Sequence, residues 1–125
     1  MNKQPSLVLF IDDDPVILNL LASSLKDHGF DIVTSQSGLD ALHILETTTP
    51  HIILADLKME PMNGFELFQE IKKIPRLRSI PFYFLTAIED KLAKKFGSTL
   101  GVNGYFCKPV DIDVLVETFR KVLSH

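Results

Sequence analysis

The chain has a single cysteine and no apolar run long enough to cross a membrane. Cys107 is the one cysteine among 125 residues, which excludes an internal disulfide and fits a reducing compartment. The longest apolar runs, such as LVLFI at 7–11, are strand-sized, whereas a membrane span needs roughly 18 apolar residues. No apolar signal-peptide region follows the opening MNKQPS. We therefore expect a cytoplasmic domain with no membrane partner.

Blocks of one charge are missing as well. The chain carries 13 Lys and Arg against 16 Asp and Glu, for a net charge of −3, and its basic residues are scattered. This distribution gives no support for nucleic-acid binding. Hydrophobic residues make up 46% and charged residues 23%, a composition typical of globular proteins. A chain of this length is expected to form one domain over 1–125, with its core between 7 and 123.

Short apolar runs alternate along the chain with segments of helical spacing. Strands are predicted at 7–11, 31–35, 51–55, 81–85 and 104–107. Helices are predicted at 15–28, 38–47, 64–73, 89–100 and 111–123. Strands that alternate with helices pair in parallel through right-handed crossovers. The predicted fold is therefore α/β, a single doubly wound (βα)5 domain whose parallel five-stranded sheet has the order 2-1-3-4-5 and helices on both faces.

Polar residues stand where four of the five apolar runs end. The acidic stretch 12–14 follows the first run, and Asp56 follows the third. Thr86 follows the fourth run, and Lys108 follows the fifth. Because ligands of open α/β sheets bind at the carboxyl ends of the strands, we expect these side chains to meet at one rim. The second run ends in TSQS, and as an edge strand it need not reach the site.

Such a set suits phosphoryl transfer with a divalent metal. Clustered carboxylates form a hard-oxygen site for Mg²⁺, which also offsets the repulsion among the adjacent aspartates. An aspartate can attack phosphorus, while an ammonium, a hydroxyl and Mg²⁺ neutralise the phosphoryl oxygens. Each residue alone has a plain structural interpretation: Asp14 is a good N-cap, Asp56 a loop residue, Thr86 a strand end and Lys108 a surface lysine. Their coincidence at one rim favours the functional interpretation.

With these residues in view, the chain resembles the receiver domain of two-component response regulators from Leu7 to Leu123. The resemblance is carried by FIDDDP, LADLKMEPMNG, FLTA and CKP, which follow or end the first, third, fourth and fifth runs. It implies a Mg²⁺-dependent phosphoacceptor that receives a phosphoryl group from a histidine kinase or histidine phosphotransfer domain. It also implies a signalling role rather than an enzyme, with only self-catalysed phosphoryl transfer and slow autodephosphorylation.

The resemblance implies a role for each acidic residue. Asp56 would be the phosphorylation site. Asp13 would bind Mg²⁺ directly, and Asp12 would act through water or as the second acidic ligand. Asp56 itself and the backbone carbonyl of Lys58 would complete the protein's ligands. The side chain of Lys58 would contact the phosphoryl group, pair with a nearby glutamate or remain a solvated surface lysine.

Further residues are implied as a switch. Thr86 would hydrogen-bond the phosphoryl group, and Lys108 would form an ion pair with it. Tyr105 stands at the switch aromatic, which turns inward when the threonine moves; its plain interpretation is a surface strand residue. Pro109 stands where the family often has a cis bond. The switch would change the surface formed by 89–100, 104–107 and 111–123.

Partners are implied only in general terms. The changed surface would bind a downstream target or an output domain not present in this chain, and Val114 with a nearby lysine is expected on it. We expect the domain to be a monomer or to form a weak dimer through the same surface. No output domain follows the last predicted helix, so we expect either a stand-alone receiver or one domain of a larger regulator or kinase.

Some residues depart from the family pattern. Glu60 stands where the family usually has proline, and Pro61 follows it, which is expected to alter the loop path and bring a carboxylate toward the metal site. Ile88, two residues past Thr86, is expected to shield the acyl phosphate from water. Cys107 alternates with Lys108 along its strand and is expected to be a buried thiol.

Two other functions remain open. DDDPV at 12–16 also fits the motif of haloacid dehalogenase-type phosphatases, in which Asp12 would be the nucleophile and Asp14 the acid/base. That interpretation leaves Asp56 and its loop unexplained. The second alternative is a receiver-like binding module that is never phosphorylated, which the shifted Pro61 and Lys58 would favour.

Overall fold

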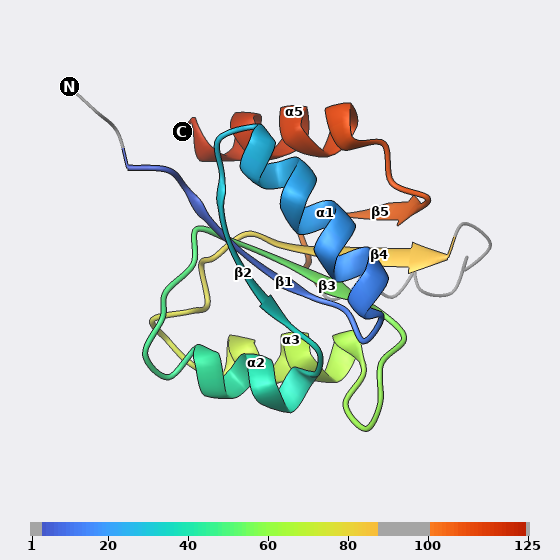
Figure 1. Ribbon diagram of the computed structural model, residues 1–125. Coiled ribbons are helices and arrows are strands. Elements are labelled where there is room, and N and C mark those ends of the chain that lie inside the picture. Colours follow the sequence, from blue (N-terminus) through green and yellow to red (C-terminus); the bar gives the residue numbers. More distant parts are fainter. Residues whose placement is uncertain (1–3, 88–100, 125) are drawn as a thin grey trace.

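The computed structural model describes residues 4–87 and 101–124. Its strands are β1 (Leu7–Ile11), β2 (Asp31–Ser35), β3 (Ile52–Asp56), β4 (Phe82–Ala87) and β5 (Gly104–Lys108). Its helices are α1 (Pro15–Asp27), α2 (Gly38–Ile44), α3 (Gly64–Lys72) and α5 (Ile112–Leu123). The sheet lies between two helical layers, with α1 and α5 on one face and α2 and α3 on the other (Figure 1).

The strands are all parallel, in the order β2-β1-β3-β4-β5. This confirms the predicted doubly wound α/β sheet with the order 2-1-3-4-5. The predicted helix at 89–100 lies outside the described residues. Within the described part of the chain, no helix combines the length and the apolar composition needed to cross a membrane.

Three strands run further at their carboxyl ends than predicted. The predicted ends were 55, 85 and 107, whereas the strands end at Asp56, Ala87 and Lys108. The ladder continues here because Asp56 pairs with Leu85, and Ala87 pairs with Lys108. Asp56 and Lys108 therefore belong to the paired strands themselves rather than to the residues that follow them.

Helix α2 is shorter than its predicted span of 38–47. It ends at Ile44, and the backbone then tightens, since the amides of Glu46 and Thr47 bond to the carbonyls of His43 and Ile44. These are three-residue turn bonds rather than α-helical ones. The prediction overran because residues 45–47 form these turns instead of continuing the helix.

Every described helix begins with a polar N-cap on the side where the strands end. The capping side chains and the amides that they accept from are Asp14 to Val16, Ser37 to Asp40, Asn63 to Glu66, and Asp111 to Asp113. These caps satisfy amides that have no partner within the helix. The positive ends of four helix dipoles therefore lie on the side of the sheet that carries the acidic residues.

Side chains alternate along the strands and build a core on each face of the sheet. Leu9, Ile53 and Phe84 pack with residues of α2 and α3, on what we call the α2/α3 face. Phe10 and Leu54 pack with residues of α1 and α5, on the α1/α5 face. This alternation also sets the face toward which each polar residue at the strand ends points.

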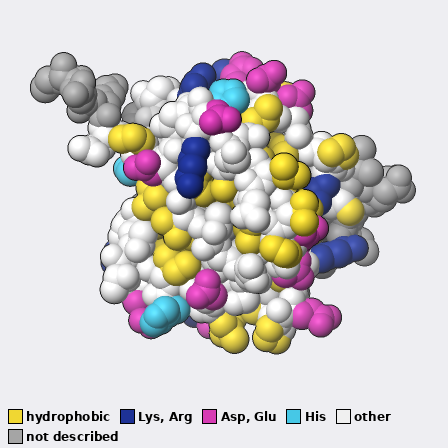
Figure 2. Space-filling view, viewed as in Figure 1, with side chains coloured by type: hydrophobic (Ala, Val, Ile, Leu, Met, Phe, Trp, Pro, Cys, Tyr) yellow, Lys and Arg dark blue, Asp and Glu magenta, His cyan; other side chains and the backbone are white. Residues whose placement is uncertain are grey.

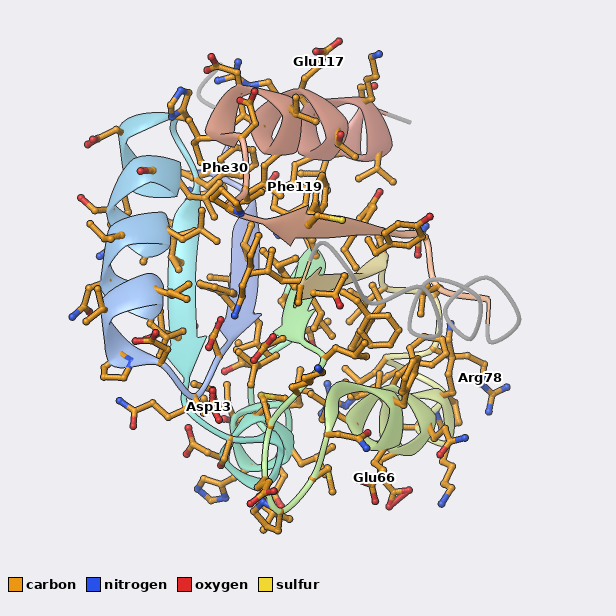
Figure 3. The ribbon with its side chains drawn as sticks, turned by 90° about the vertical axis from the view of Figure 1, so that its right-hand side faces the viewer. Asp13, Phe30, Glu66, Arg78, Glu117 and Phe119 are labelled. Atoms are coloured by element: carbon orange, nitrogen blue, oxygen red, sulfur yellow. The ribbon has the colours of Figure 1, made fainter. Side chains whose placement is uncertain are left out.

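An aromatic cluster joins α5 to the sheet on the α1/α5 face. Phe119 is fully buried, and its ring centroid lies 6.0 Å from that of Phe30, 5.6 Å from that of Tyr83 and 6.1 Å from that of Phe106. Figure 3 shows Phe119 of α5 and Phe30 lying close together. Since β5 contributes both Phe106 and Lys108, this cluster also anchors the strand that carries the lysine.

We expect Phe119→Ala to lower the free energy of unfolding by about 3–5 kcal/mol, because it leaves a cavity in a core with no solvent access. Urea denaturation followed by circular dichroism measures the change. The control is Val114→Ala on the same helix, whose side chain is 50% exposed and should change stability by less than about 0.5 kcal/mol. A loss below about 1 kcal/mol for Phe119→Ala would contradict this account of the core.

Candidate functional site

Asp12, Asp13, Asp56 and Lys108 meet at the carboxyl end of the sheet. Asp12 and Asp13 follow β1, whereas Asp56 ends β3 and Lys108 ends β5. Figure 3 labels Asp13 at this edge, beside the first turn of α1. One carboxylate oxygen from each aspartate lies within 4.8 Å of the others. The predicted juxtaposition of the acids and the lysine is therefore present.

Asp12 is the most tightly held of the acids. Its side chain is fully buried, and its Oδ1 accepts a hydrogen bond from the Asp14 amide at 3.0 Å. Its own amide donates to the carbonyl of Ser35 at 3.1 Å. Its Oδ2 lies 3.2 Å from Lys108 Nζ in an ion pair but accepts no well-aligned hydrogen bond from the described residues. This oxygen is therefore a buried acceptor with capacity for another ligand.

Lys108 is shared between two acids. Its Nζ lies 3.4 Å from Asp56 Oδ1 as well as 3.2 Å from Asp12 Oδ2. Burial acts to lower the pKa of Lys108, but attraction to Asp56 and Asp12 outweighs it and raises the pKa above the usual 10.5. The ammonium is therefore charged at all physiological pH values, and it is the cation of the site.

One ammonium does not balance three carboxylates. Burial, followed by the nearby charge of Asp12, raises the pKa of Asp56 from 3.8 to about 6, although Lys108 opposes the shift. With Asp12, Asp13 and Asp56 ionised, the cluster keeps two uncompensated negative charges. Such a site favours a further cation or the protonation of one acid.

A magnesium ion fits this donor set. Mg²⁺ prefers hard oxygen ligands and uses few protein carboxylates, because it keeps several of its waters. The site offers oxygens of Asp12, Asp13 and Asp56, and Asp12 Oδ2 is buried with no hydrogen bond from the described residues. A divalent cation would match the two excess charges. Asp13 is exposed, so one side of the site is open to solvent.

Thr86 and Tyr105 lie on the opposite face of the sheet from the acid cluster. Thr86 follows the alternation of Phe82 and Phe84 on the α2/α3 face, is 2% exposed, and contacts the Ala87 carbonyl at 3.5 Å. Tyr105 pairs with Phe84 in the register and is 39% exposed. The threonine hydroxyl therefore stands at the rim without joining the acid cluster of the described residues.

The loop after β3 only partly matches the expectations. The side chains of Lys58 and Glu60 are exposed, and neither forms an ion pair within residues 4–87 and 101–124. Glu60 is not among the described carboxylates whose oxygens lie within 4.8 Å of one another around Asp56, so its expected approach to the metal site stays a prediction. The Glu60-Pro61 and Lys108-Pro109 bonds are both cis, the second as the resemblance implied.

Gly64 brings this loop back against the acceptor strand. Its amide bonds to the carbonyl of Leu57 at 2.9 Å, and a Cβ at this position would lie 2.7 Å from the carbonyl oxygen of Asp56. Only glycine allows so close a backbone approach. The start of α3 therefore fixes the backbone immediately after Asp56.

Sequence reasoning missed one residue and misjudged another. The second strand was not expected to reach the site, yet Ser35 at its end accepts the amide of Asp12. The available signal was the position of TSQS at the end of the second run. Its Ser35 pairs with Ile11, the last residue of the first run. Cys107 is half-buried rather than fully buried, because β5 is an edge strand. The predicted contribution of Ile88 lies outside the described residues.

An apolar groove adjoins the site on the α1/α5 face. It has a volume of about 590 Å³ and is lined by Ile17, Leu20, Leu21, Ser24, Leu85, Lys108, Pro109, Val110 and Ile112. Leu20 is 66% exposed and Val16, one turn earlier, is 62% exposed. Figure 2 shows apolar side chains at the surface beside α1. The groove therefore runs from exposed apolar residues of α1 to the lysine of the acid cluster.

Comparisons with known proteins agree on one family. The family model described as "Response regulator receiver domain" matches residues 8–120. The chain is 35% identical to the transcriptional regulatory protein GlrR of Escherichia coli over 99% of its own length, but it spans 28% of that relative. It is 28% identical to protein PilH of Pseudomonas aeruginosa, covering 94% of this chain and 97% of that protein.

A solved structure shows the same fold. The chemotaxis response regulator CheY4 of Vibrio cholerae superposes with a TM-score of 0.86 at 26% identity, covering 94% of this chain and 98% of the other. The strand order and the two helical layers described above are therefore those of a known group of proteins.

We expect Asp56→Asn to stabilise the metal-free protein at pH 7 by about 1–2 kcal/mol. The pKa of Asp56 is raised from 3.8 to about 6, so the folded state binds more protons than the unfolded state between these values. The stabilisation that this group contributes is complete below about pH 4 and is lost as the pH rises to about 6. A two-unit shift corresponds to at most about 3 kcal/mol, and solvent at the open rim reduces it.

Urea denaturation in EDTA between pH 4 and 7.5 measures this difference. The variant and the wild type should have similar stability near pH 4 and diverge above pH 6. Asp31→Asn is the control, since Asp31 is exposed at the opposite end of an edge strand. A variant that is less stable than the wild type at pH 7 would contradict the assigned environment of Asp56.

Proposed function

This chain belongs to the response regulator receiver domain family of two-component signalling, and from that premise we propose that Asp56 accepts a phosphoryl group from a histidine kinase or histidine phosphotransfer domain. The observation that carries the proposal is the position of Asp56 between Asp12 and Lys108 at an open rim. A carboxylate there has a cation beside it, and its buried side chain (6% exposed) lies next to the exposed Asp13, the side from which a donor would approach. The role is signalling, with the modified domain as the product.

The acid cluster supplies the metal site of the proposed reaction. Asp12, Asp13, Asp56 and the backbone carbonyl of Lys58 would hold Mg²⁺, which supplies positive charge to the phosphoryl oxygens during transfer. Lys108 Nζ, 3.4 Å from Asp56 Oδ1, holds a second positive charge on the same side. Hydrogen bonds to the Asp14 amide and the Ser35 carbonyl hold Asp12 in position beside the other two acids.

The transfer itself is a displacement at phosphorus. An ionised oxygen of Asp56 attacks the phosphorus of the donor phosphohistidine, and the phosphorus–nitrogen bond breaks as the acyl phosphate bond forms. The bonding electrons leave with the imidazole of the donor. Because the pKa of Asp56 lies near 6, the acid is largely ionised at pH 7 even before a metal lowers that value.

Modification would then bias a conformational equilibrium. The new phosphoryl oxygens would attract Lys108 and the hydroxyl of Thr86, which now lies on the opposite face of β4. Inward movement of Thr86 would make room for Tyr105, two positions along on the neighbouring strand and 39% exposed. We propose that this changes the surface of residues 89–100, β5 and α5, and that a downstream target or output domain binds there.

We further propose that the phosphodonor docks beside α1. A donor histidine must reach Asp56 through the open rim, so the donor protein must cover the residues around it. The groove that ends at Lys108, with the exposed apolar side chains of Val16 and Leu20, suits an apolar helix surface of the donor. The unpaired, half-buried Cys107 fits a reducing compartment, and we place the domain in the cytoplasm.

The phosphatase alternative is disfavoured by the positions of its two acids. Asp12, its nucleophile, has no solvent-exposed surface, and its Oδ1 is occupied by the Asp14 amide. Asp14, its acid/base, caps α1 by accepting from Val16 at 2.9 Å. Asp56, by contrast, accepts no backbone amide from the described residues, and its Oδ1 forms only the ion pair with Lys108. The unphosphorylated binding module differs from our proposal only in its chemistry, so an experiment separates them.

Acetyl phosphate with MgCl₂ should add one phosphoryl group to the wild-type protein and none to Asp56→Asn, because Asp56 is the acceptor. Intact-protein mass spectrometry measures the addition of phosphate at about neutral pH. The phosphatase alternative instead predicts labelling that survives in Asp56→Asn and depends on Asp12. Failure of the wild-type protein to gain phosphate or to respond to beryllofluoride with Mg²⁺ would favour the binding module and overturn our proposal.

Leu20→Glu should slow phosphotransfer from a phosphorylated histidine kinase at least tenfold without changing the rate with acetyl phosphate. A carboxylate at this 66% exposed position disrupts an apolar contact with a protein donor but leaves the rim open to a small molecule. The kinase is the one that transfers fastest in a profile of candidate kinases. Val114→Glu, on α5, is the control and should leave both rates unchanged. Equal rates of phosphotransfer from the kinase to Leu20→Glu and to wild type would show that the donor does not bind at the groove.

A further inference from the structure

Two contacts connect the first turn of α2 to the acid cluster. The first runs through Ser35, which is 2% exposed at the end of β2. Its hydroxyl lies 2.8 Å from Asp40 Oδ2 and 3.0 Å from the Ser37 carbonyl, both in the first turn of α2 or its cap. Its carbonyl accepts the amide of Asp12 at 3.1 Å. Ser35 therefore ties the start of α2 to the backbone of a magnesium ligand.

The second contact is between α2 and the loop after β3. Gly38, the first residue of α2, is buried against Met62. A Cβ at position 38 would lie 2.8 Å from Met62 Sδ, 3.0 Å from its Cγ and 3.1 Å from its Cβ. Any larger side chain must displace Met62. That residue belongs to the loop that carries Lys58 and leads from Asp56 to α3.

We propose that Ser35, Asp40 and Gly38 are positioning residues for the magnesium site. Ser35 and Asp40 hold the backbone from which Asp12 projects, and Gly38 allows the loop that carries the Lys58 carbonyl to lie against α2. The inference rests on the proposed function, because it assumes that Mg²⁺ binds at this rim. It assigns α2, which contributes no ligand of its own, an effect on metal affinity that acts through the backbone of the ligands.

The expected change in Mg²⁺ affinity depends on how directly each residue contacts a metal ligand. Residues that hydrogen-bond directly to metal ligands commonly change metal affinity by 10–100-fold when removed. Ser35 holds the backbone of Asp12 rather than its carboxylate, so a smaller effect is expected. Loss of the Ser35 hydroxyl or of its acceptor on Asp40 should weaken Mg²⁺ binding about three- to tenfold.

The test is a titration of each variant with MgCl₂, followed by two-dimensional amide NMR. The spectra give the Mg²⁺ dissociation constant and show directly whether the variant is folded. Ser35→Ala and Asp40→Ala should bind Mg²⁺ three- to tenfold more weakly. Asp40→Asn keeps an oxygen that accepts from Ser35 and should remain within twofold of wild type. Weak binding by Asp40→Asn would mean that Asp40 acts through its charge, and would overturn the positioning role.

Ser37→Ala is the matched control for damage to α2. Ser37 caps the same helix by accepting the Asp40 amide at 3.0 Å, so its loss weakens the helix start but leaves the Ser35 hydroxyl and its acceptor in place. It should bind Mg²⁺ within twofold of wild type. Amide hydrogen exchange adds a second readout: the Asp12 amide should exchange faster in Ser35→Ala than in Ser37→Ala. Equal exchange in the two variants would contradict the proposal.

A double-mutant cycle tests the Gly38 contact. Gly38→Ala should weaken Mg²⁺ binding, and Met62→Ala should relieve most of this by removing the two closest atoms. Additive effects would overturn this half of the proposal. If the wild-type protein itself binds no Mg²⁺, the proposed function fails. If the wild type binds and all variants match it, only the inference about α2 fails.

Discussion

The candidate site depends on one ammonium that lies beside two buried carboxylates. Lys108 Nζ lies within 3.4 Å of oxygens from both Asp12 and Asp56, which come from different strands. Without this cation, Asp12 would be an uncompensated charge with no solvent access, a situation that costs several kcal/mol. With it, the cluster is still short of positive charge, and this deficit is what makes the site suited to a divalent metal and a phosphoryl group.

The sheet topology makes that shared contact possible. Strand β4 lies between β3 and β5, so the lysine must reach across β4 to meet the acids. The residue paired with Lys108 is Ala87, whose small side chain leaves room, and alternation directs Thr86 to the other face. The hydroxyl of Thr86 is therefore held apart from the acid cluster. The proposed switch would move it toward the cluster.

Much of this arrangement was predictable because parallel strands end on one side. The apolar runs located the strands, the doubly wound fold type supplied their order, and the residues at their ends included Asp12, Asp13, Asp56 and Lys108. The remainder depended on contacts that no local pattern encodes. Ser35 acts through a backbone carbonyl, the exposure of Cys107 follows from its edge position, and the loop after β3 packs through Met62 on Gly38. Such features follow from tertiary register rather than from residue type.

The acids all lie in the first half of the chain, whereas their cation lies on the last strand, and this has a consequence for how the protein is made. A nascent or truncated copy that lacks β5 would already contain the three carboxylates of the cluster but not Lys108, the lysine that lies beside them. Its acids would repel one another without the ammonium that lies between Asp12 and Asp56 in the complete fold. On the proposed function, incomplete copies would accept no phosphoryl group. A kinase would then phosphorylate only molecules whose last strand has docked.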